Sequence, residues 1–181
     1  MRTRRLIAAV LAVVSLAMPI AAFAGQVPRT HGRVTKVLLV VPTTEKPGTI
    51  LISTSARTLD LVLGSGKVAR YAIGVGRDGF TWSGIVKVGR KAEWPEWRPP
   101  AEMRQRSPDL PDIMPPGPFN PLGIRALYLF KGGEDTLYRI HGTNDGLSIG
   151  DSVSSGCFRM TNADILELYD QVEIGAKVVV K

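Results

Sequence analysis

Residues 137–164 read LYRIHGTNDGLSIGDSVSSGCFRMTNAD, a stretch that contains the only cysteine of the chain and one of its two histidines. Apolar and polar side chains alternate over residues 137–140, which predicts a half-buried strand that delivers His141 at its end. Thr161 with Asp164 resembles a capping box, and the apolar residues that follow recur at helical spacing. A loop rich in Gly, Ser, Asn and Asp lies between the strand and the helix. Loops of this kind usually display catalytic side chains.

Cys157 and His141 are the residues of this stretch that can carry out nucleophilic chemistry. A thiol with a pKa of about 8.5 is mostly protonated at neutral pH, and only the thiolate attacks, so a neighbouring imidazole has to accept the proton. Cys157 also lies just before the predicted helix, whose unpaired N–H groups and dipole would favour the thiolate. The alternative is an inert buried thiol, which a Gly/Ser loop downstream of His141 disfavours. The pattern therefore predicts acyl transfer through a cysteine.

The residues around Cys157 are candidates for binding the substrate. An acyl intermediate needs hydrogen-bond donors for its oxyanion, and Gly156 lets the backbone approach a bound carbonyl closely. The N–H groups from Gly156 to Phe158 are therefore the predicted donors, with Ser155 in the same substrate-binding loop. Arg159 is suited to hold a substrate carboxylate in the fork of its guanidinium group.

Several segments together resemble one known family. HGTN at 141–144 and SSGCFRM at 154–160, followed by Asn162, are similar to the signature of the L,D-transpeptidase catalytic domain, also called the YkuD domain. The similarity extends to AIGVG, NPLG and VEIGAKVVV in residues 72–76, 120–123 and 172–180, so that it covers roughly residues 48–181. One position departs from the family's common form, which has histidine where this chain has Ser155. Any role of that second histidine in binding or protonating substrate is therefore not transferred to this chain.

The resemblance implies a fold and a mechanism. The family has a mixed β-sandwich with the cysteine loop at one end, and its catalytic histidine is oriented by a backbone carbonyl, at the position of Gly142 here. Asp145 and Asp151 are the acidic alternatives, and we interpret both as loop-capping carboxylates. Family members of this kind cross-link bacterial peptidoglycan through a cysteine thioester, and some instead attach proteins to the wall or cut such links.

The first 24 residues have the pattern of a cleavable secretory signal. Three arginines precede a short uncharged apolar run, and small residues end at Ala24. An uncleaved membrane anchor is the alternative, but the run falls short of the roughly 20 residues that span a bilayer. We expect cleavage after Ala24, secretion across the inner membrane and a periplasmic or cell-wall-associated protein with no stable membrane span. An N-terminal segment (25–47) containing a solvated His31 would then precede the catalytic domain (48–181).

Charge, cysteine and histidine content argue against a nucleic-acid-binding protein and against a zinc protein. The formal net charge of +7 includes three signal arginines, which leaves a mild excess that suits an anionic wall polymer. No basic helix or aromatic ladder points to nucleic acid. One His and one Cys with loop carboxylates fall short of a zinc site, so we expect no metal and no cofactor. A lone cysteine in an exported protein is prone to oxidation, which favours a functional reason for Cys157.

Short strands with close turn signals follow one another from residue 48 onwards. Residues 58–63 run through Gly64-Ser65-Gly66 into residues 67–73, which predicts a hairpin. A Gly-Gly turn predicts a second antiparallel pair that ends at His141. The other predicted elements are strands at 49–53, 84–92 and 177–180, a helix at 161–172, and a strand or transitional segment at 37–41. The fold class is therefore mainly β, an L,D-transpeptidase-type sandwich with one short helix after the cysteine loop.

Residues 93–120 contain most of the prolines and form an insertion. Proline fixes φ and removes a donor, so this segment cannot be a central strand or a long helix. One interpretation is a lid over the catalytic groove, in which Trp94 and Trp97 stack on sugar or stem peptide. The other is a rigid surface loop whose tryptophans cover the edge of the core.

Together with these observations, the resemblance implies a peptidoglycan L,D-transpeptidase with the following reaction. His141 takes the proton of Cys157, the thiolate attacks the bond between a meso-diaminopimelate (or similar L-centre) and D-alanine, and an amine of a second stem peptide resolves the thioester. Water as acceptor would make a hydrolase or a protein–peptidoglycan linkage cutter. A papain-like protease is disfavoured because its Cys precedes its His in the chain. A non-catalytic wall-binding protein would tolerate Cys157→Ala.

Overall fold

The computed structural model describes residues 34–181, and the predicted signal peptide and His31 lie outside the described residues. Its strands are β1 (Val37–Val40), β2 (Ile50–Ser53), β3 (Thr58–Gly64), β4 (Lys67–Ala72), β5 (Val75–Gly76), β6 (Gly84–Glu93), β7 (Arg125–Lys131), β8 (Glu134–His141), β9 (Ser152–Ser154), β10 (Phe158–Arg159) and β11 (Lys177–Val180). The helices are α1 (Ala101–Arg106), the 3-10 turn η1 (Gly146–Ser148) and α2 (Asn162–Gln171). The mainly β class is confirmed, with 41% strand and 13% helix among residues 34–181.

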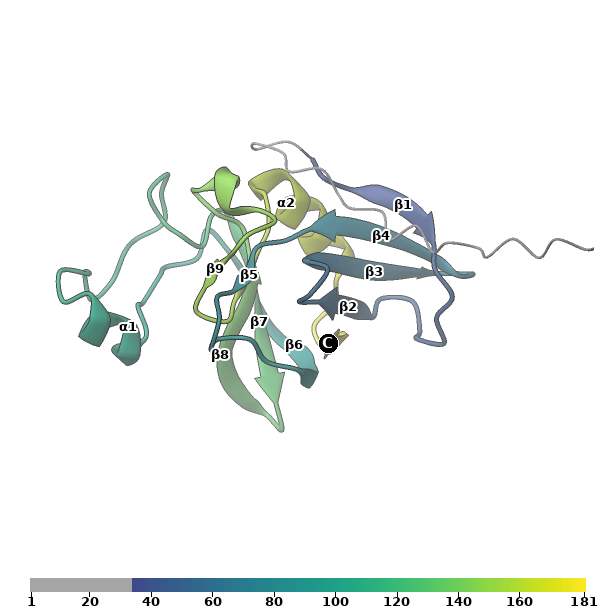
Figure 1. Ribbon diagram of the computed structural model, residues 1–181, viewed down its shortest axis with the longest axis horizontal. Helices are drawn as coiled ribbons and strands as arrows, with labels where there is room; N and C mark the ends of the chain where they lie inside the picture. The colour runs from purple at the N-terminus through teal and green to yellow at the C-terminus, as the bar shows by residue number, and fades with distance from the viewer. Residues whose placement is uncertain (1–33) are drawn as a thin grey trace, which may run out of the picture.

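Nine of the strands form one sheet in the order β1-β4-β3-β2-β11-β6-β7-β8-β10, and β5 pairs with β9 separately. The last strand of the chain, β11, joins the two halves, because it lies parallel to β2 and antiparallel to β6. Strands β2–β4 run across Figure 1 and β6–β8 at a steep angle to them, so the sheet bends around a core. The two predicted antiparallel hairpins are confirmed as β3–β4 and β7–β8.

The core is built from the alternation of side chains along the strands. In β7, Leu127 and Leu129 are fully buried, and Ile140 of β8 and Phe158 of β10 face the same side. Burying one such side chain stabilises the fold by about 1.5–3 kcal/mol. The intervening residues of these strands therefore point away from the core, which leaves that face of β7, β8 and β10 for other functions.

Helix α2 covers the core and begins as predicted. The Thr161 hydroxyl accepts from the Asp164 backbone amide at 3.1 Å, as expected of an N-cap residue. The Asp164 carboxylate, which is fully buried, accepts from Thr161 Oγ1 at 2.9 Å and from Thr35 N and Oγ1 at 3.0 and 2.9 Å. The cap thus also fastens the segment before β1 to the helix.

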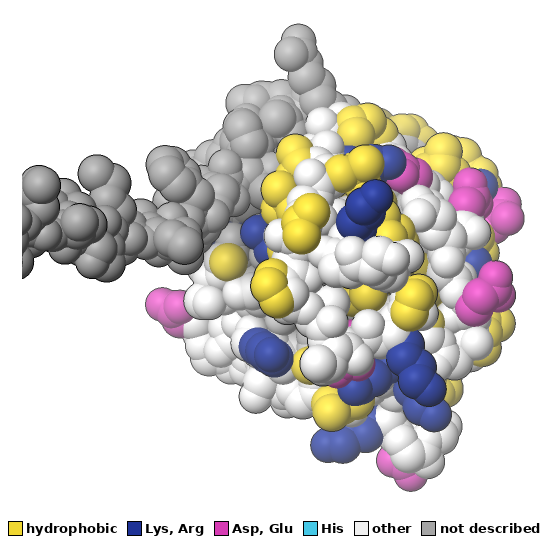
Figure 2. Space-filling model, turned by 90° about the vertical axis from the view of Figure 1, so that its right-hand side faces the viewer, with side chains coloured by type: hydrophobic (Ala, Val, Ile, Leu, Met, Phe, Trp, Pro, Cys, Tyr) yellow, Lys and Arg dark blue, Asp and Glu magenta, His cyan; other side chains and the backbone are white. Residues whose placement is uncertain are grey.

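Strand β1 is one edge of the nine-stranded sheet, and β10 is the other. Leu38 and Val40 are 67% and 79% exposed, so β1 adds little to the core. Figure 2 shows the face of the molecule at this end, where hydrophobic side chains alternate with Lys, Arg and acidic ones. Across residues 34–181, no helix is long and apolar enough to cross a membrane.

The proline-rich insertion leaves the sheet between β6 and β7 and projects to one side (Figure 1). It contains no central strand and no long helix, as predicted, but the six-residue helix α1, which has no buried residue, was not predicted. Its base is held by the buried Asn120, whose side-chain amide donates to the carbonyl groups of Pro95 and Pro115 at 2.9 and 3.1 Å. Trp97 and Met114 also exchange two backbone hydrogen bonds of 2.9 and 2.8 Å. The insertion is therefore an ordered excursion.

Candidate active site

The parallel pairing of β8 with β10 brings the two halves of residues 137–164 together. The register places Phe158 opposite Ile140 and Arg159 opposite His141, and Met160 N donates to His141 O at 2.8 Å. Because Ile140 and Phe158 are buried in the core, His141 and Arg159 lie on the other side of the sheet, together with Cys157, which precedes Phe158. The structure thus brings the predicted nucleophile, base and substrate cation to one face.

His141 is held by the residue that follows it. His141 is 4% exposed, and its Nδ1 lies 2.5 Å from the Gly142 carbonyl oxygen. A carbonyl oxygen only accepts, so Nδ1 carries the proton and Nε2 is left as the basic nitrogen. Burial lowers the pKa of His141 to about 4, and the charges of Arg159 and Arg139 act in the same direction. His141 is therefore neutral at pH 7 and able to accept a proton.

Cys157 is half-buried, and its Sγ lies 3.9 Å from the Leu137 carbonyl oxygen. Burial raises the pKa of the Cys157 thiol, while a hydrogen bond from the Arg139 backbone and the positive charges of Arg139 and Arg159 oppose that change. The net direction of the pKa shift is upward, so in the resting state at pH 7 Cys157 is a thiol while His141 is a neutral imidazole. Deprotonation then has to accompany the reaction.

An irregularity in β8 positions the carbonyl group that faces the sulfur. The register between β7 and β8 shifts after Tyr128, and Leu137 has a φ of 63°, in the left-handed region that side-chain-bearing residues avoid. The Asp135 carboxylate accepts from Leu137 N at 2.8 Å, and Thr136 Oγ1 donates to Leu129 O at 2.7 Å. The alternation of residues 137–140 predicted the strand but not this bulge.

The loop before Cys157 is held by two side chains that the sequence analysis did not single out. Ser154 Oγ donates to the Cys157 carbonyl at 2.6 Å and accepts from Gly156 N at 3.1 Å. Trp82 Nε1 donates to Gly156 O at 2.9 Å, and its ring stacks on Tyr138 with centroids 4.6 Å apart. Trp82 and Gly156 are 74 residues apart in the chain, and no local pattern links them.

The structure adds detail to two predictions about the surroundings of Cys157. The Gly156 amide, a predicted oxyanion donor, is engaged by Ser154, whereas the Cys157 amide has no acceptor among residues 34–181. Helix α2 begins at Asn162, five residues after Cys157, with β10 between them. The helix thus starts with Thr161 as its cap, as predicted, but the two-residue strand β10, which was not predicted, separates Cys157 from the helix end.

Gly156 is a position where a side chain does not fit. Its φ is +105°, and a Cβ atom would lie 2.4 Å from Tyr138 Cε1. Gly79 has a similar φ of +81° but open space around it. We expect Gly79→Ala to lower the free energy of unfolding by about 1 kcal/mol, from backbone strain alone. Gly156→Ala should lower it by a further 1–3 kcal/mol or so, because Tyr138 and Trp82 must move.

Denaturant unfolding of the two variants measures this difference, and alkylation of Cys157 reports on the loop. Equal destabilisation by Gly79→Ala and Gly156→Ala would contradict the close packing of Gly156 against Tyr138.

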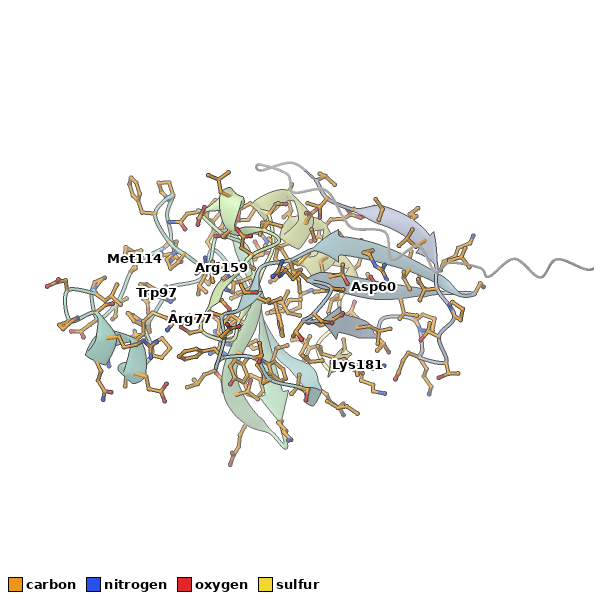
Figure 3. The ribbon with its side chains drawn as sticks, in the orientation of Figure 1. Asp60, Arg77, Trp97, Met114, Arg159 and Lys181 are labelled. Carbon is orange, nitrogen blue, oxygen red and sulfur yellow. The ribbon has the colours of Figure 1, made fainter. Side chains whose placement is uncertain are left out.

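Arg159 and Ser155 lie at the open side of the site. The Arg159 guanidinium is half-buried, and in the described part of the chain no carboxylate lies within ion-pair distance of it. Ser155 Oγ lies 3.5 Å from Nη2 of Arg106, which the excursion carries at the end of α1. Figure 3 shows Arg159 and Arg77 in the part of the molecule that adjoins the excursion with Trp97 and Met114.

The loop after His141 is held by hydrogen bonds to the side chains of Asn162 and Asp145. Asn162 Oδ1 accepts from Thr143 N at 3.2 Å and from Ile124 N at 3.3 Å. The Asp145 carboxylate accepts from Leu147 N at 3.2 Å, so this residue caps η1, as interpreted from the sequence. Within residues 34–181, no three metal-ligating side chains form a cluster.

The fold and the site define a β protein that carries a half-buried thiol and a buried imidazole bound to a backbone carbonyl on the same face of one sheet. The domain model described as L,D-transpeptidase catalytic domain, or YkuD, matches residues 47–180. The chain belongs to this family.

Individual relatives agree with this assignment. The probable L,D-transpeptidase YbiS of Escherichia coli K12 is 37% identical over 148 residues, which are 77% of this chain and 46% of the relative. The chain thus spans about half the length of the first curated relatives that it matches.

Solved structures show the same fold. One is the crystal structure of an L,D-transpeptidase (residues 123–326) from Xylanimonas cellulosilytica, which is 19% identical with a TM-score of 0.54. The match covers 78% of this chain and 63% of the solved chain. A crystal structure from Brucella melitensis, described as a probable carnitine operon oxidoreductase, is 44% identical with a TM-score of 0.55, covering 87% and 99% of the two chains.

Proposed function

We propose that this protein is a peptidoglycan L,D-transpeptidase that forms a thioester between Cys157 and a tetrapeptide stem and transfers the acyl group to an amine. The observation that carries the proposal is the contact between His141 Nδ1 and the Gly142 carbonyl, on the face that also presents Cys157. It leaves Nε2 as the basic nitrogen for the thiol proton.

In the first half of the reaction, His141 accepts the proton of Cys157 as the sulfur attacks the carbonyl carbon of the bond between the L-centre and D-alanine. The Cys157 backbone amide, which has no acceptor within residues 34–181, is our candidate donor to the oxyanion, with Phe158 N as its neighbour. The imidazolium then protonates the nitrogen of D-alanine, the C–N bond breaks, and D-alanine leaves.

In the second half, a side-chain amine of another stem peptide attacks the thioester carbonyl. His141 accepts the proton of the amine and returns it to the sulfur as the C–S bond breaks, which restores the thiol. Arg159 feels the charge of Asp145 but has no carboxylate within ion-pair distance in the described chain, and we assign it to a carboxylate of the stem peptide. Ser155 and Gly156 lie in the loop that contains Cys157, and we assign them to the wall of the substrate-binding site.

The position of the excursion supports its interpretation as a cover for the site. Arg106 reaches Ser155, and the Asn144 side chain donates to Phe119 O at 2.9 Å, so both arms of the excursion contact catalytic loops. A covered groove favours transfer over hydrolysis if it admits the amine and excludes water.

The basic, apolar start of the sequence supports a location beyond the inner membrane, where the peptidoglycan substrate lies. We assign residues 1–24 to a signal, residues 25–47 to an N-terminal segment and residues 48–181 to the catalytic domain.

Incubation of the mature protein with disaccharide tetrapeptides, followed by mass spectrometry, tests the proposal. We expect cross-linked dimers that have lost one D-alanine. Trimmed tripeptide monomers without dimers would identify a hydrolase of the same family. Unchanged substrate in the presence of intact, reduced Cys157 would contradict both activities and favour a wall-binding protein.

A further inference from the structure

A pocket of about 230 Å³ lies behind the catalytic histidine loop, between the base of the excursion and the start of α2. Trp94, Asn144 and Asn162 contribute side chains to it, and Gly123 forms part of its wall. A Cβ atom on Gly142 would lie 2.2 Å from Asn162 Oδ1, so the pocket backs directly onto the residue that orients His141.

Trp94 lines this pocket although its backbone conformation is unfavourable and its large apolar side chain is exposed to solvent. Its φ is 45°, in the left-handed region that is unusual for a bulky residue, and a hydrogen bond of 2.8 Å from Trp94 N to Ile124 O holds it there. The indole is nevertheless 53% exposed. A strained backbone that presents a large aromatic ring to solvent gains no core packing in return, which points to a binding role for the ring.

The polar groups of the pocket are uncharged and partly unused. Asn144 Nδ2 donates to Phe119 O, and Asn162 Oδ1 accepts two backbone amides, which fixes the orientation of both amide groups. Asn144 Oδ1, Asn162 Nδ2 and the Trp94 indole N–H make no hydrogen bond with any residue of 34–181. The pocket therefore offers one acceptor and two kinds of donor beside an aromatic face.

The charge of the pocket distinguishes between parts of the substrate. None of its lining residues is charged, whereas the face with Cys157 carries Arg139 and Arg159. A stem peptide presents carboxylates, which suit the arginines, and a sugar presents C–H faces, hydroxyl groups and an acetamido group, which suit an indole and amides. The volume is below the 300–1,000 Å³ or so of typical ligand pockets and fits a single ring.

We propose that this pocket binds one N-acetylated hexosamine ring of the glycan strand, with the Trp94 indole against the sugar face and the Asn144 and Asn162 amides on its polar groups. The proposal rests on the proposed function for its substrate class. It makes Trp94 a residue that selects glycan-attached stems over free peptides.

Steady-state kinetics on a disaccharide tetrapeptide and on the same tetrapeptide without sugar test this selection. We expect Trp94→Ala to lower kcat/KM for the disaccharide substrate by about tenfold and to leave the free tetrapeptide within about twofold. Trp94→Phe keeps an aromatic face and should retain most of the preference. Ile113→Ala shortens an apolar side chain that is 40% exposed in the same excursion but does not line the pocket, and should change neither value.

An equal loss on both substrates, or no loss on either, would overturn the sugar site.

A second measurement, of sugar binding by NMR, does not depend on turnover. In a Cys157→Ala variant, the three tryptophan indole N–H signals in an NMR spectrum are titrated with the peptide-free disaccharide, and Trp94→Phe assigns one of them. We expect the Trp94 signal to shift and the Trp82 signal to stay. No shift at millimolar sugar overturns this inference, while turnover that fails with both substrates overturns only the proposed function.

Discussion

Cys157→Ser is expected to reduce consumption of disaccharide tetrapeptide by at least about 10³-fold. The substitution exchanges one atom at a half-buried position, so the fold should persist. The serine hydroxyl is far less acidic than the thiol, and a His141 with a pKa of about 4 is a weak base, too weak to activate an alcohol. Product formation measured by mass spectrometry over a long incubation gives the ratio of the two rates.

A matched variant separates loss of the nucleophile from damage to the loop. Val153→Ala shortens a 41% exposed side chain in the neighbouring strand β9 that has no assigned role, and should keep activity within about threefold. Thermal unfolding of both variants should match the wild type. Substantial turnover by a folded Cys157→Ser protein would show that the sulfur is not the nucleophile.

His141→Gln is expected to lower the acylation rate at pH 7 by about 10²–10⁴-fold. The amide cannot accept the thiol proton, and the pKa of Cys157 is raised by burial, so only a small thiolate fraction remains to react. Stopped-flow measurement of D-alanine release in a single turnover gives this rate. The wild-type rate should be nearly constant between about pH 5 and pH 8, because neutral His141 persists down to its pKa of about 4.

The pH dependence provides the control for this variant. In His141→Gln, the rate should rise with pH as free thiolate forms, and it should approach that of the wild type above the thiol pKa. An acid limb near pH 6.5 in the wild type would contradict the burial of the imidazole.

Folding has to be monitored over the same range. The unfolded chain binds a proton at His141 near pH 6.5 and the native chain only near pH 4, so stability decreases as pH falls through this window. Circular dichroism at each pH distinguishes this loss from loss of the base.

Local patterns of the sequence predicted the elements that carry the site. The alternation of residues 137–140 predicted β8, the Gly-rich turns predicted the β3–β4 and β7–β8 hairpins, and Thr161 marked the start of α2. These features depend on residues that are close together in the sequence, so side-chain periodicity and capping residues are enough to predict them.

The features that sequence reasoning missed depend on contacts between distant residues. Strand β10 has two residues and exists because it pairs with β8, so the sequence did not show that a strand separates Cys157 from α2. Trp82 reaches the cysteine loop from 74 residues away, and the Leu137 bulge depends on the register with β7. Short parallel pairs and bulges have no periodicity of their own, so single-sequence patterns do not reveal them.

The central claim is that Cys157, activated by a neutral His141, becomes acylated by the stem peptide. Intact-mass spectrometry of the protein seconds after mixing with disaccharide tetrapeptide at pH 7, followed by peptide mapping, tests it directly. We expect a mass increase equal to the substrate minus D-alanine, located on Cys157 and absent from Cys157→Ser. Turnover without any adduct on Cys157, or an adduct on another residue, would contradict it.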